Sequence, residues 1–302
     1  MGADRLRCLL SHLLAILDGP RVHFLSDTSK DVTWQRFGSL QAKGGTLREL
    51  RGFVVGVVVG FLGGLFGKGG SAIATPLLSL IGYPGFIAVA SPLPATIPGT
   101  LIASGEYWEA HLLDWEIVWW SIGVGVPATI VGSLLTKYTG ARPLLILTGI
   151  LVLGFGISFL AWPRETASQE GLPPDPSATF RPSFWRTRLV LIAAGVGVIS
   201  GLLANAGGFL LAPAYARFLR QPVKKSFACS LAVAAVLALP GTIVHAWLGH
   251  ISWLVAGLVA LGSAPFSYLG ARIAIHTKAS RLERIYGIVL TVLGIFFLYQ
   301  LQ

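Results

Sequence analysis

Long apolar stretches alternate with short polar ones along most of the chain. Eight apolar segments follow residue 49, and each has about the length of a membrane-spanning helix. They cover residues 50–81, 86–103, 117–135, 144–161, 189–215, 226–248, 251–275 and 282–301. Aromatic residues, which mark membrane–water interfaces, collect at segment ends: Tyr107, Trp108, Trp115, Trp162, Trp185, Trp247, Trp253 and Tyr299. The pattern predicts an all-α polytopic membrane protein with about eight transmembrane segments.

Two of these segments are interrupted by glycine. The first contains Gly67-Lys68-Gly69-Gly70-Ser71, and the fifth contains Asn205-Ala206-Gly207-Gly208. Because glycine is a poor helix former, each interruption predicts a broken helix. Unwound backbone within a bilayer is tolerated where it is buried in protein or lines a wet cavity.

The two halves of the chain repeat. Gly60, Gly64, Gly70 and Pro76 match Gly197, Gly201, Gly207 and Pro213, each 137 residues later. Ala90, Trp115, Pro127, Gly132, Gly149 and Gly156 match Ala228, Trp253, Pro265, Gly270, Gly287 and Gly294, each 138 residues later. Pro98-Gly99-Thr100 recurs as Pro240-Gly241-Thr242. We expect an N-terminal tail (1–46), a four-segment repeat (47–161), a polar connector (162–188) and a second four-segment repeat (189–302). Internal repeats with broken helices are typical of secondary transporters.

Composition agrees with a membrane protein. Of 302 residues 54% are hydrophobic and only 12% are charged, and the mean hydropathy is +0.71. This excludes a soluble enzyme, a disordered chain and a secreted disulfide scaffold. Cys8 and Cys229 lie far apart and indicate neither a disulfide framework nor a zinc site. The tail is expected to be a surface amphipathic helix or disordered, because no small-residue cleavage site follows its short apolar run.

The net charge of +10 comes mainly from loops, which indicates orientation rather than nucleic-acid binding. Basic residues follow three of the segments. Lys137 and Arg142 follow the third, Arg217, Arg220, Lys224 and Lys225 follow the fifth, and Lys278, Arg281 and Arg284 follow the seventh. Acidic residues (Glu106, Glu109, Asp114) follow the second segment, and only His250 follows the sixth. We expect the first group of loops to be cytoplasmic and the second to be external. A single crossing in segments 1 and 5 makes the repeats parallel, whereas a re-entrant hairpin changes this topology.

Lys68 is the most informative residue. About 15 apolar residues precede it, which places it roughly 22 Å along a helix and inside the hydrocarbon core. The following helix begins near Ser71, and a helix start favours an anion. Gly67, Lys68, Gly69, Gly70 and Ser71 therefore predict a small-anion site. The alternative is that the glycines only allow close helix packing and Lys68 extends to an interface. The spacing does not fit a phosphate-binding P-loop.

Matching positions in the other segments supply further candidates. Asn205, Gly207 and Gly208 stand where the first repeat has its break, and Asn205 replaces Lys68 with an amide. Ser91, Cys229 and Ser230 align in segments 2 and 6 and are predicted to contact substrate. The alternative is a purely structural role, in which the hydroxyls bond to their own helices and Cys229 is a small buried side chain. His245 is a candidate for proton coupling, or an interfacial histidine without a function. We predict no metal, no cofactor and no catalytic residues.

The glycine-rich break, the proline that follows it and the small–Ser motif of the next helix occur twice. The residues are Gly64 to Pro76 with Ala90-Ser91, and Gly201 to Pro213 with Ala228-Cys229-Ser230. In these features residues 50–301 resemble the TauE/SafE family of sulfite and organosulfonate exporters. The resemblance implies secondary transport of small sulfur-containing anions across the bacterial inner membrane. We expect one repeat to move against the other around a central site.

Other functions remain open from the sequence. The alternatives are a permease for thiosulfate or a carboxylate and, outside transport, a membrane assembly factor or an intramembrane enzyme. The expected partners are a small anionic substrate and the lipid bilayer, without nucleic acid; a homodimer is left open.

Overall fold

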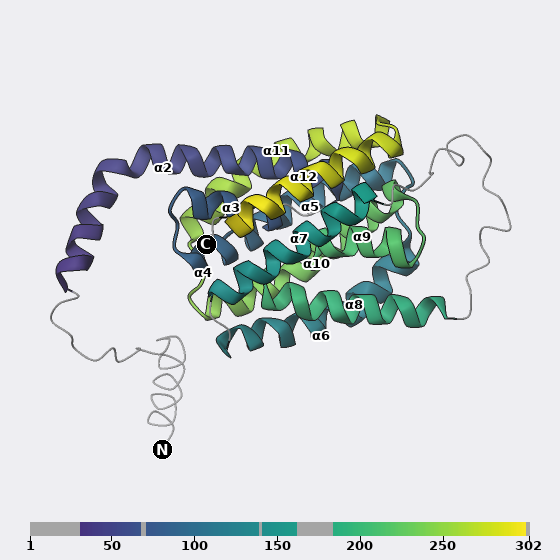
Figure 1. Ribbon diagram of the computed structural model, residues 1–302, viewed down its shortest axis with the longest axis horizontal. Coiled ribbons are helices and arrows are strands. Elements are labelled where there is room, and N and C mark those ends of the chain that lie inside the picture. The colour runs from purple at the N-terminus through teal and green to yellow at the C-terminus, as the bar shows by residue number, and fades with distance from the viewer. Residues whose placement is uncertain (1–30, 68–70, 139–140, 162–183, 300–302) are drawn as a thin grey trace, which may run out of the picture. The chain divides into compact units, whose positions relative to one another are not determined.

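The structure is a computed structural model that describes residues 31–67, 71–138, 141–161 and 184–299. The chain forms two units, residues 1–47 and 48–302. Helix α2 (Asp31–Phe66) begins in the first unit, and its residues from 48 onward belong to the second. The helices that follow are α3 (Ser71–Leu80), α4 (Gly85–Ala90), α5 (Pro92–Glu109), α6 (Trp115–Leu135), the short 3₁₀ helix η1 (Thr136–Tyr138), α7 (Ala141–Ala161), α8 (Trp185–Leu202), α9 (Gly208–Phe218), α10 (Val223–Trp247), α11 (Trp253–His276) and α12 (Ala279–Tyr299), as Figure 1 shows.

Six helical stretches of the described residues are long and apolar enough to cross a membrane. They are Glu49–Phe66, Gly85–Glu109, Trp115–Leu135, Trp185–Leu202, Val223–Trp247 and Trp253–His276. Helices α7 and α12 have 21 residues each, but α12 carries Arg281, Glu283 and Arg284 in its first turns. The predicted all-helical, multi-pass membrane protein is confirmed, with six such stretches against eight predicted segments.

Glycines of α2 lie directly against the backbone of α11. The pairs are Gly56 with Val259, Gly60 with Ser263 and Gly64 with Ser267. A Cβ atom on Gly64 would lie 2.1 Å from the carbonyl oxygen of Ser267, so only glycine permits this approach. Residue numbers rise together along both helices, which means that α2 and α11 run in the same direction.

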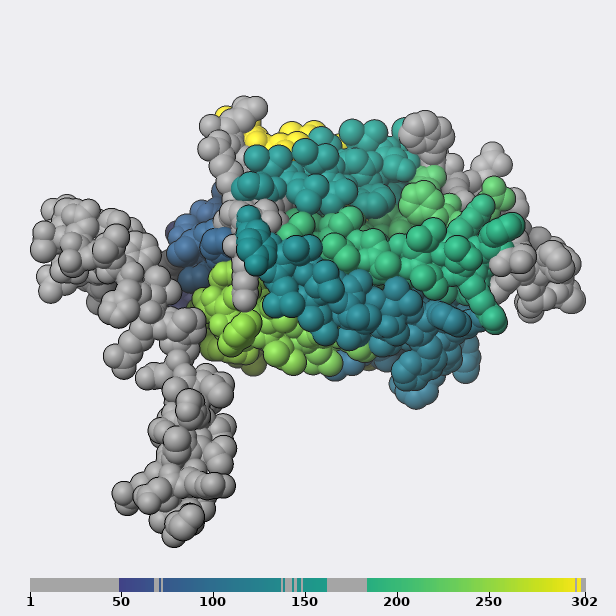
Figure 2. All heavy atoms as spheres, turned by 90° about the horizontal axis from the view of Figure 1, so that it is seen from below, coloured from purple at the N-terminus to yellow at the C-terminus, as the bar shows by residue number. Residues whose placement is uncertain are grey.

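Helices α6 and α8 pack in the same way. Gly197 lies against Gly125, and a Cβ atom on Gly201 would lie 2.1 Å from the carbonyl oxygen of Thr129. Figure 2 shows α8 lying along α6 on one face of the second unit. Numbers rise together here too, so α6 and α8 are parallel. Helices α7 and α12 pack on each other in opposite directions, through Gly156 and Gly294.

The chain reverses at each break. Helix α5 also runs parallel to α11, because Ala95 bonds to Ser263 and Gly99 lies beside Ser267. Since α2 and α5 share one direction, α3 must return between them. Helices α8 and α10 likewise both run parallel to α6, with α9 returning between them. The broken helices occur where the sequence predicts them, and of the two topologies left open above the reversals agree with the re-entrant one rather than with a single crossing.

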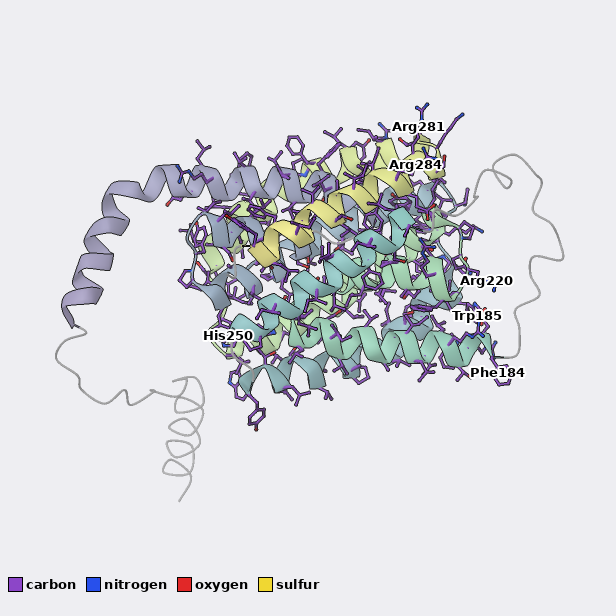
Figure 3. All side chains as sticks on the ribbon, in the orientation of Figure 1. Phe184, Trp185, Arg220, His250, Arg281 and Arg284 are labelled. Carbon is purple, nitrogen blue, oxygen red and sulfur yellow. The ribbon has the colours of Figure 1, made fainter. Side chains whose placement is uncertain are left out.

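The reversal also corrects the predicted orientation of the loops. Figure 3 shows Arg220, Arg281 and Arg284 at one end of the second unit, here named the arginine end, and His250 at the opposite, histidine end. Glu106 pairs with Arg272 at 3.2 Å, so the acidic loop after α5 lies at the arginine end.

The loop after α6 is misplaced by the sequence reasoning in the same way. Because α6 runs back from the arginine end, the loop that follows it lies at the histidine end. We predicted the opposite end for both loops. The physical reason is that each reversal adds a turn that the charge pattern alone does not reveal.

Candidate functional site

The two breaks meet inside the second unit, although 134 residues separate them in sequence. The Ser71 hydroxyl at the start of α3 donates to the Asn205 side-chain carbonyl oxygen at 2.5 Å. The same hydroxyl accepts a hydrogen bond from the backbone N–H of Ala206 at 3.3 Å. Ser71 and Asn205 are buried, with 1% and 3% of their surface exposed. Ser71 and Asn205 form the centre of the candidate site, here named the break junction. Its residues are Gly67, Ser71, Asn205, Ala206, Gly207, Gly208 and Ser230.

The second break is held by its own backbone and by Asn205. The Asn205 N–H donates to the Ser200 carbonyl at 2.8 Å, and the Asn205 side chain accepts from the Gly207 N–H at 3.3 Å. Gly207 has a φ of +79°, which favours glycine, and it precedes α9 without a side-chain cap. No side chain among the described residues caps the first N–H groups of α9, and a helix start of this kind is electropositive.

The first break is closed by α10. Gly67 has a φ of +68°, and a Cβ atom there would lie 2.5 Å from the Cα atom of Phe227. The Ser230 hydroxyl donates to the Gly67 carbonyl at 2.7 Å. Ser230, a predicted substrate contact, thus holds the end of α2 in place. Lys68, Gly69 and Gly70, which carried much of the sequence prediction, lie outside the described residues.

Ser91 and Cys229 make hydrogen bonds outside the break junction, although Cys229 adjoins Ser230 on α10. The Ser91 hydroxyl accepts from the Ser252 N–H at 3.0 Å, just before α11. The Cys229 sulfur accepts from the Asp114 N–H at 3.3 Å, just before α6. These contacts lie at opposite ends of the second unit, since α11 begins at the histidine end and α6 at the arginine end. Each side chain fixes the start of a spanning helix, so we leave both out of the candidate site.

A group of buried hydroxyls lies between α6, α8 and α10 and was not foreseen. The side-chain oxygens of Thr129, Ser133, Ser200 and Thr242, here named the hydroxyl cluster, are buried and have no hydrogen-bond partner among the described residues. The hydroxyl of Ser200 faces Gly207, and that of Ser133 faces Gly241. Of these four residues only Thr242 is named from the sequence, as part of the repeated Pro-Gly-Thr motif, since a lone Ser or Thr in an apolar segment usually bonds to its own helix.

His245 contacts the end of α8. Its Nε2 atom lies 3.2 Å from the carbonyl oxygen of Gly201, and its Nδ1 atom lies 3.2 Å from Nδ1 of His250. The side chain of His245 is 1% exposed. The sequence predicted His245 as a candidate and placed His250 in an external loop, but gave no sign that the two rings meet. Their separation of five residues spans the end of a helix, where spacing does not fix distance.

A small cavity lies between α2, α5 and α11. It leaves about 10 Å³ for the centre of a water-sized sphere, which is about enough for one molecule. Its polar lining residues are Thr96, Thr100, Ser263 and Ser267, and the hydroxyl of each donates to a backbone carbonyl. The cavity is too small for an oxyanion.

Comparison with known proteins identifies the family. The pattern that defines the sulfite exporter TauE/SafE family matches residues 52–297. A probable membrane transporter protein of Xylella fastidiosa (strain 9a5c) is 29% identical over 262 residues, which cover 81% of this chain and 93% of that protein. The probable membrane transporter protein YunE of Bacillus subtilis is 24% identical, with 82% and 96% covered.

A third relative has a similar identity. The probable membrane transporter protein MJ0441 of Methanocaldococcus jannaschii is 26% identical, with 81% and 93% covered. No solved structure gives a significant match. The match to the family pattern over most of the chain shows that the protein belongs to the TauE/SafE sulfite exporter family.

Proposed function

We propose that this chain is a secondary transporter that carries a small sulfur-containing anion, such as sulfite or an organosulfonate, across the bacterial inner membrane. The observation that carries the proposal is the hydrogen bond between Ser71 and Asn205, which joins the starts of two half-helices deep inside the bundle. Family membership and the names of the relatives support transport. Only the family name supports sulfite.

The break junction suits an anion chemically. Two helix starts converge there, and each carries roughly half a positive charge from its aligned peptide dipoles. The side-chain NH₂ of Asn205 adds a neutral donor, and Lys68, three residues before Ser71 in the sequence, adds a full positive charge. Broken helices whose N-termini face a central site are a recurrent way to bind anionic groups in transporters.

We further propose that the two halves are inverted repeats with four segments each. Reciprocal contacts support this: Gly64 meets Ser267 as Gly201 meets Thr129, and both pairs match at offsets of 137 and 138 residues. Helix α8 also runs opposite to α2. The domain limits of 47–161 and 189–302 follow from the sequence and remain part of the proposal.

The moving bodies differ from those expected from sequence. Helix α11 of the second half packs on α2 and α5, and α6 of the first half packs on α8 and α10. Moving one half against the other would break the tightest glycine contacts in the unit. We propose instead that α2, α5 and α11 move as one body, and that α6, α8 and α10 move as the other. The break junction lies between them.

Charge gives the orientation of this proposal. The arginine end carries Arg220, Arg281 and Arg284, as Figure 3 shows. The helix ends that lie there add five more cations, namely Arg186, Arg217, Lys225, Arg272 and Lys278. Because Lys and Arg concentrate on the cytoplasmic side of bacterial inner membranes, we assign the arginine end to the cytoplasm. The histidine end then faces the outside.

The test is anion flux through purified protein in liposomes. Sulfite, sulfoacetate, thiosulfate and sulfate are followed in parallel by exchange across the membrane. We expect saturable exchange of at least one anion, with an apparent affinity that falls at least about tenfold in Lys68→Ala because a charge contact is lost. Lys225→Ala, which removes an exposed lysine at the arginine end, is the matched control and keeps the affinity.

Two results would contradict this proposal. Folded protein that exchanges none of the four anions would favour a carboxylate permease or an assembly factor. Exchange that is equally tight in Lys68→Ala would remove the lysine from the site and leave the glycines as packing residues only.

A further inference from the structure

Two histidine rings meet near the histidine end of the second unit. His245 lies in the last turns of α10, and His250 lies in the short link to α11, with the two Nδ1 atoms 3.2 Å apart. The N–H of His250 also donates to the carbonyl of His245 at 3.0 Å. The ring of His250 stacks on Phe86 of α4, with centroids 4.5 Å apart and planes at 12°. The pair is therefore held from both sides rather than touching by chance.

The contacts fix where the protons lie. A carbonyl oxygen can only accept, so His245 must carry a proton on Nε2 to bond to Gly201 at 3.2 Å. Neutral His245 then has a bare Nδ1, which accepts a hydrogen bond from the Nδ1–H of His250. Neutral His250 has in turn a bare Nε2. The pair in its neutral form is a complete hydrogen-bond chain with one vacant basic nitrogen, and that nitrogen belongs to the residue nearer the end of the unit.

The helices that hold the pair, α4 through Phe86 and α8 through Gly201, bring no further titratable side chain to it. Helix α4 and the last turns of α8 contain no ionisable residue. Helix α6 ends beside α8 through the bond from Thr136 to Leu202, and Lys137 follows, with a side chain outside the described part. Burial lowers the pKa of His250 below its ordinary value of 6.5. A neutral pair at pH 7 follows from this direction, with proton uptake at lower pH.

We propose that the His245–His250 pair is the proton-binding site of this transporter and couples proton movement to anion movement. This rests on the proposed transport function. The step is balanced: a proton from water binds Nε2 of His250, and the proton on Nδ1 of His250 passes to Nδ1 of His245. The pair gains one proton, and no other bond changes. The positive charge then resides on His245, against the last carbonyls of α8, where a helix dipole favours a cation.

The hydroxyl cluster has members near this pair and near the break junction. Thr242 lies one turn before His245 on α10, and Ser200 lies beside Gly201 and faces Gly207. Four buried hydroxyls without partners are unusual, because a buried polar group without a hydrogen bond is unfavourable. They provide donors and acceptors between the charged histidine and the substrate.

The experiment compares two kinds of flux in the same liposomes. Exchange of an anion at equal pH needs no net proton, whereas uptake driven by a pH gradient does. Thiosulfate, sulfoacetate and sulfate hold no titratable proton between pH 6 and 8, so a pH-sensitive dye reports only carried protons. We expect His245→Gln and His250→Phe to keep exchange within about twofold and to lose at least about tenfold of the gradient-driven uptake and of the dye signal.

The variants are chosen to preserve the fold. Gln at 245 can still donate to the Gly201 carbonyl, and Phe at 250 can still stack on Phe86. His276→Gln is the control, because His276 is exposed at the arginine end and bonds only to Arg272 of its own helix among the described residues. Full gradient-driven uptake in His245→Gln and His250→Phe would overturn the proposal.

A second readout decides the matter if no anion is exchanged. Protein labelled with ¹⁵N in its imidazole rings is titrated by NMR in detergent. We expect two coupled rings, of which one carries its proton on Nε2 and the other on Nδ1, and expect His250→Phe to change the titration of His245. Two rings that titrate independently, each near 6.5, would contradict a shared proton.

Discussion

The contact among α2, α5 and α11 and the contact among α6, α8 and α10 share a framework but differ in chemistry. In both, a glycine of the broken helix touches a carbonyl of the parallel partner: Gly64 at Ser267 and Gly201 at Thr129. Among α2, α5 and α11, the hydroxyls of Thr96, Thr100, Ser263 and Ser267 donate to backbone carbonyls. Among α6, α8 and α10, the hydroxyls of Thr129, Ser133, Ser200 and Thr242 have no hydrogen-bond partner among the described residues.

The two groups of helices also differ in what contacts the equivalent carbonyls of Gly64 and Gly201. The Gly64 carbonyl accepts from the hydroxyl of Tyr107 at 3.3 Å, whereas the Gly201 carbonyl lies 3.2 Å from Nε2 of His245. A phenol keeps its proton across the physiological pH range, and an imidazole does not. The comparison teaches that the repeated glycines specify packing, while the residues that differ between the halves mark where a proton can act.

The largest effect is expected from the shared framework. Gly64→Ala and Gly201→Ala each place a Cβ atom 2.1 Å from a carbonyl oxygen, which no side-chain movement relieves. We expect each to cost about 3 kcal/mol or more, or to prevent folding. Gly195→Ala, with open space around it, is the control. Thermal unfolding in detergent measures all three, and a wild-type melting temperature in either buried variant would show that the helices are not this close.

The next effect is on anion affinity, and it compares Asn205, which lies in the break junction, with Ser91, which was left out of it. Asn205→Asp puts a carboxylate at the break junction, where it opposes an anion, and we expect anion affinity to fall at least about tenfold. Ser91→Ala removes only the acceptor for Ser252 and keeps the affinity. Competition of unlabelled anion in the exchange assay gives both values. A larger loss in Ser91→Ala would return that residue to the site.

A smaller effect tests the unpartnered hydroxyls. Thr242→Val removes a buried hydroxyl without a partner, so we expect a gain of about 1 kcal/mol in stability. Thr100→Val, its match in the first contact, removes a bond to Thr96 and is expected to lose up to about 1 kcal/mol. Unfolding midpoints that shift in the same direction for both would mean that the two contacts do not differ in this way.

The smallest effect concerns the ion pair that corrected the loop orientation. Arg272 is 60% exposed in its pair with Glu106, so Glu106→Gln should change stability by less than about 1 kcal/mol. A charge reversal tests the contact itself. The double variant Glu106→Arg with Arg272→Glu should recover the stability that either single variant loses. Additive losses in the double variant would separate the two residues and reopen the assignment of that loop.

The sequence predicts the helices well and their directions poorly. Predicted segments 117–135 and 226–248 match α6 (Trp115–Leu135) and α10 (Val223–Trp247) closely, because apolar length decides membrane spans. Both breaks were expected from glycine. Whether the chain reverses at each break was left open, since glycine permits a turn without specifying its angle.

The candidate site was predicted in part for the same reason. Ser71 and Asn205 were named from the repeat, and the structure brings them into contact. Ser91 and Cys229 align with each other in the repeat, but their hydrogen bonds lie at opposite ends of the second unit. His250 and the hydroxyl cluster depend on distances between helices, which sequence spacing does not contain.

The central claim is that the two breaks meet at the place where the anion binds, and a reversible cross-link tests it most directly. Ser71→Cys and Asn205→Cys are combined with Cys8→Ser and Cys229→Ala, and anion exchange is measured before oxidation, after oxidation and after reduction. The account predicts a disulfide between the two new cysteines, loss of exchange while it is present, and recovery on reduction. Exchange that continues unchanged in fully cross-linked protein would contradict it.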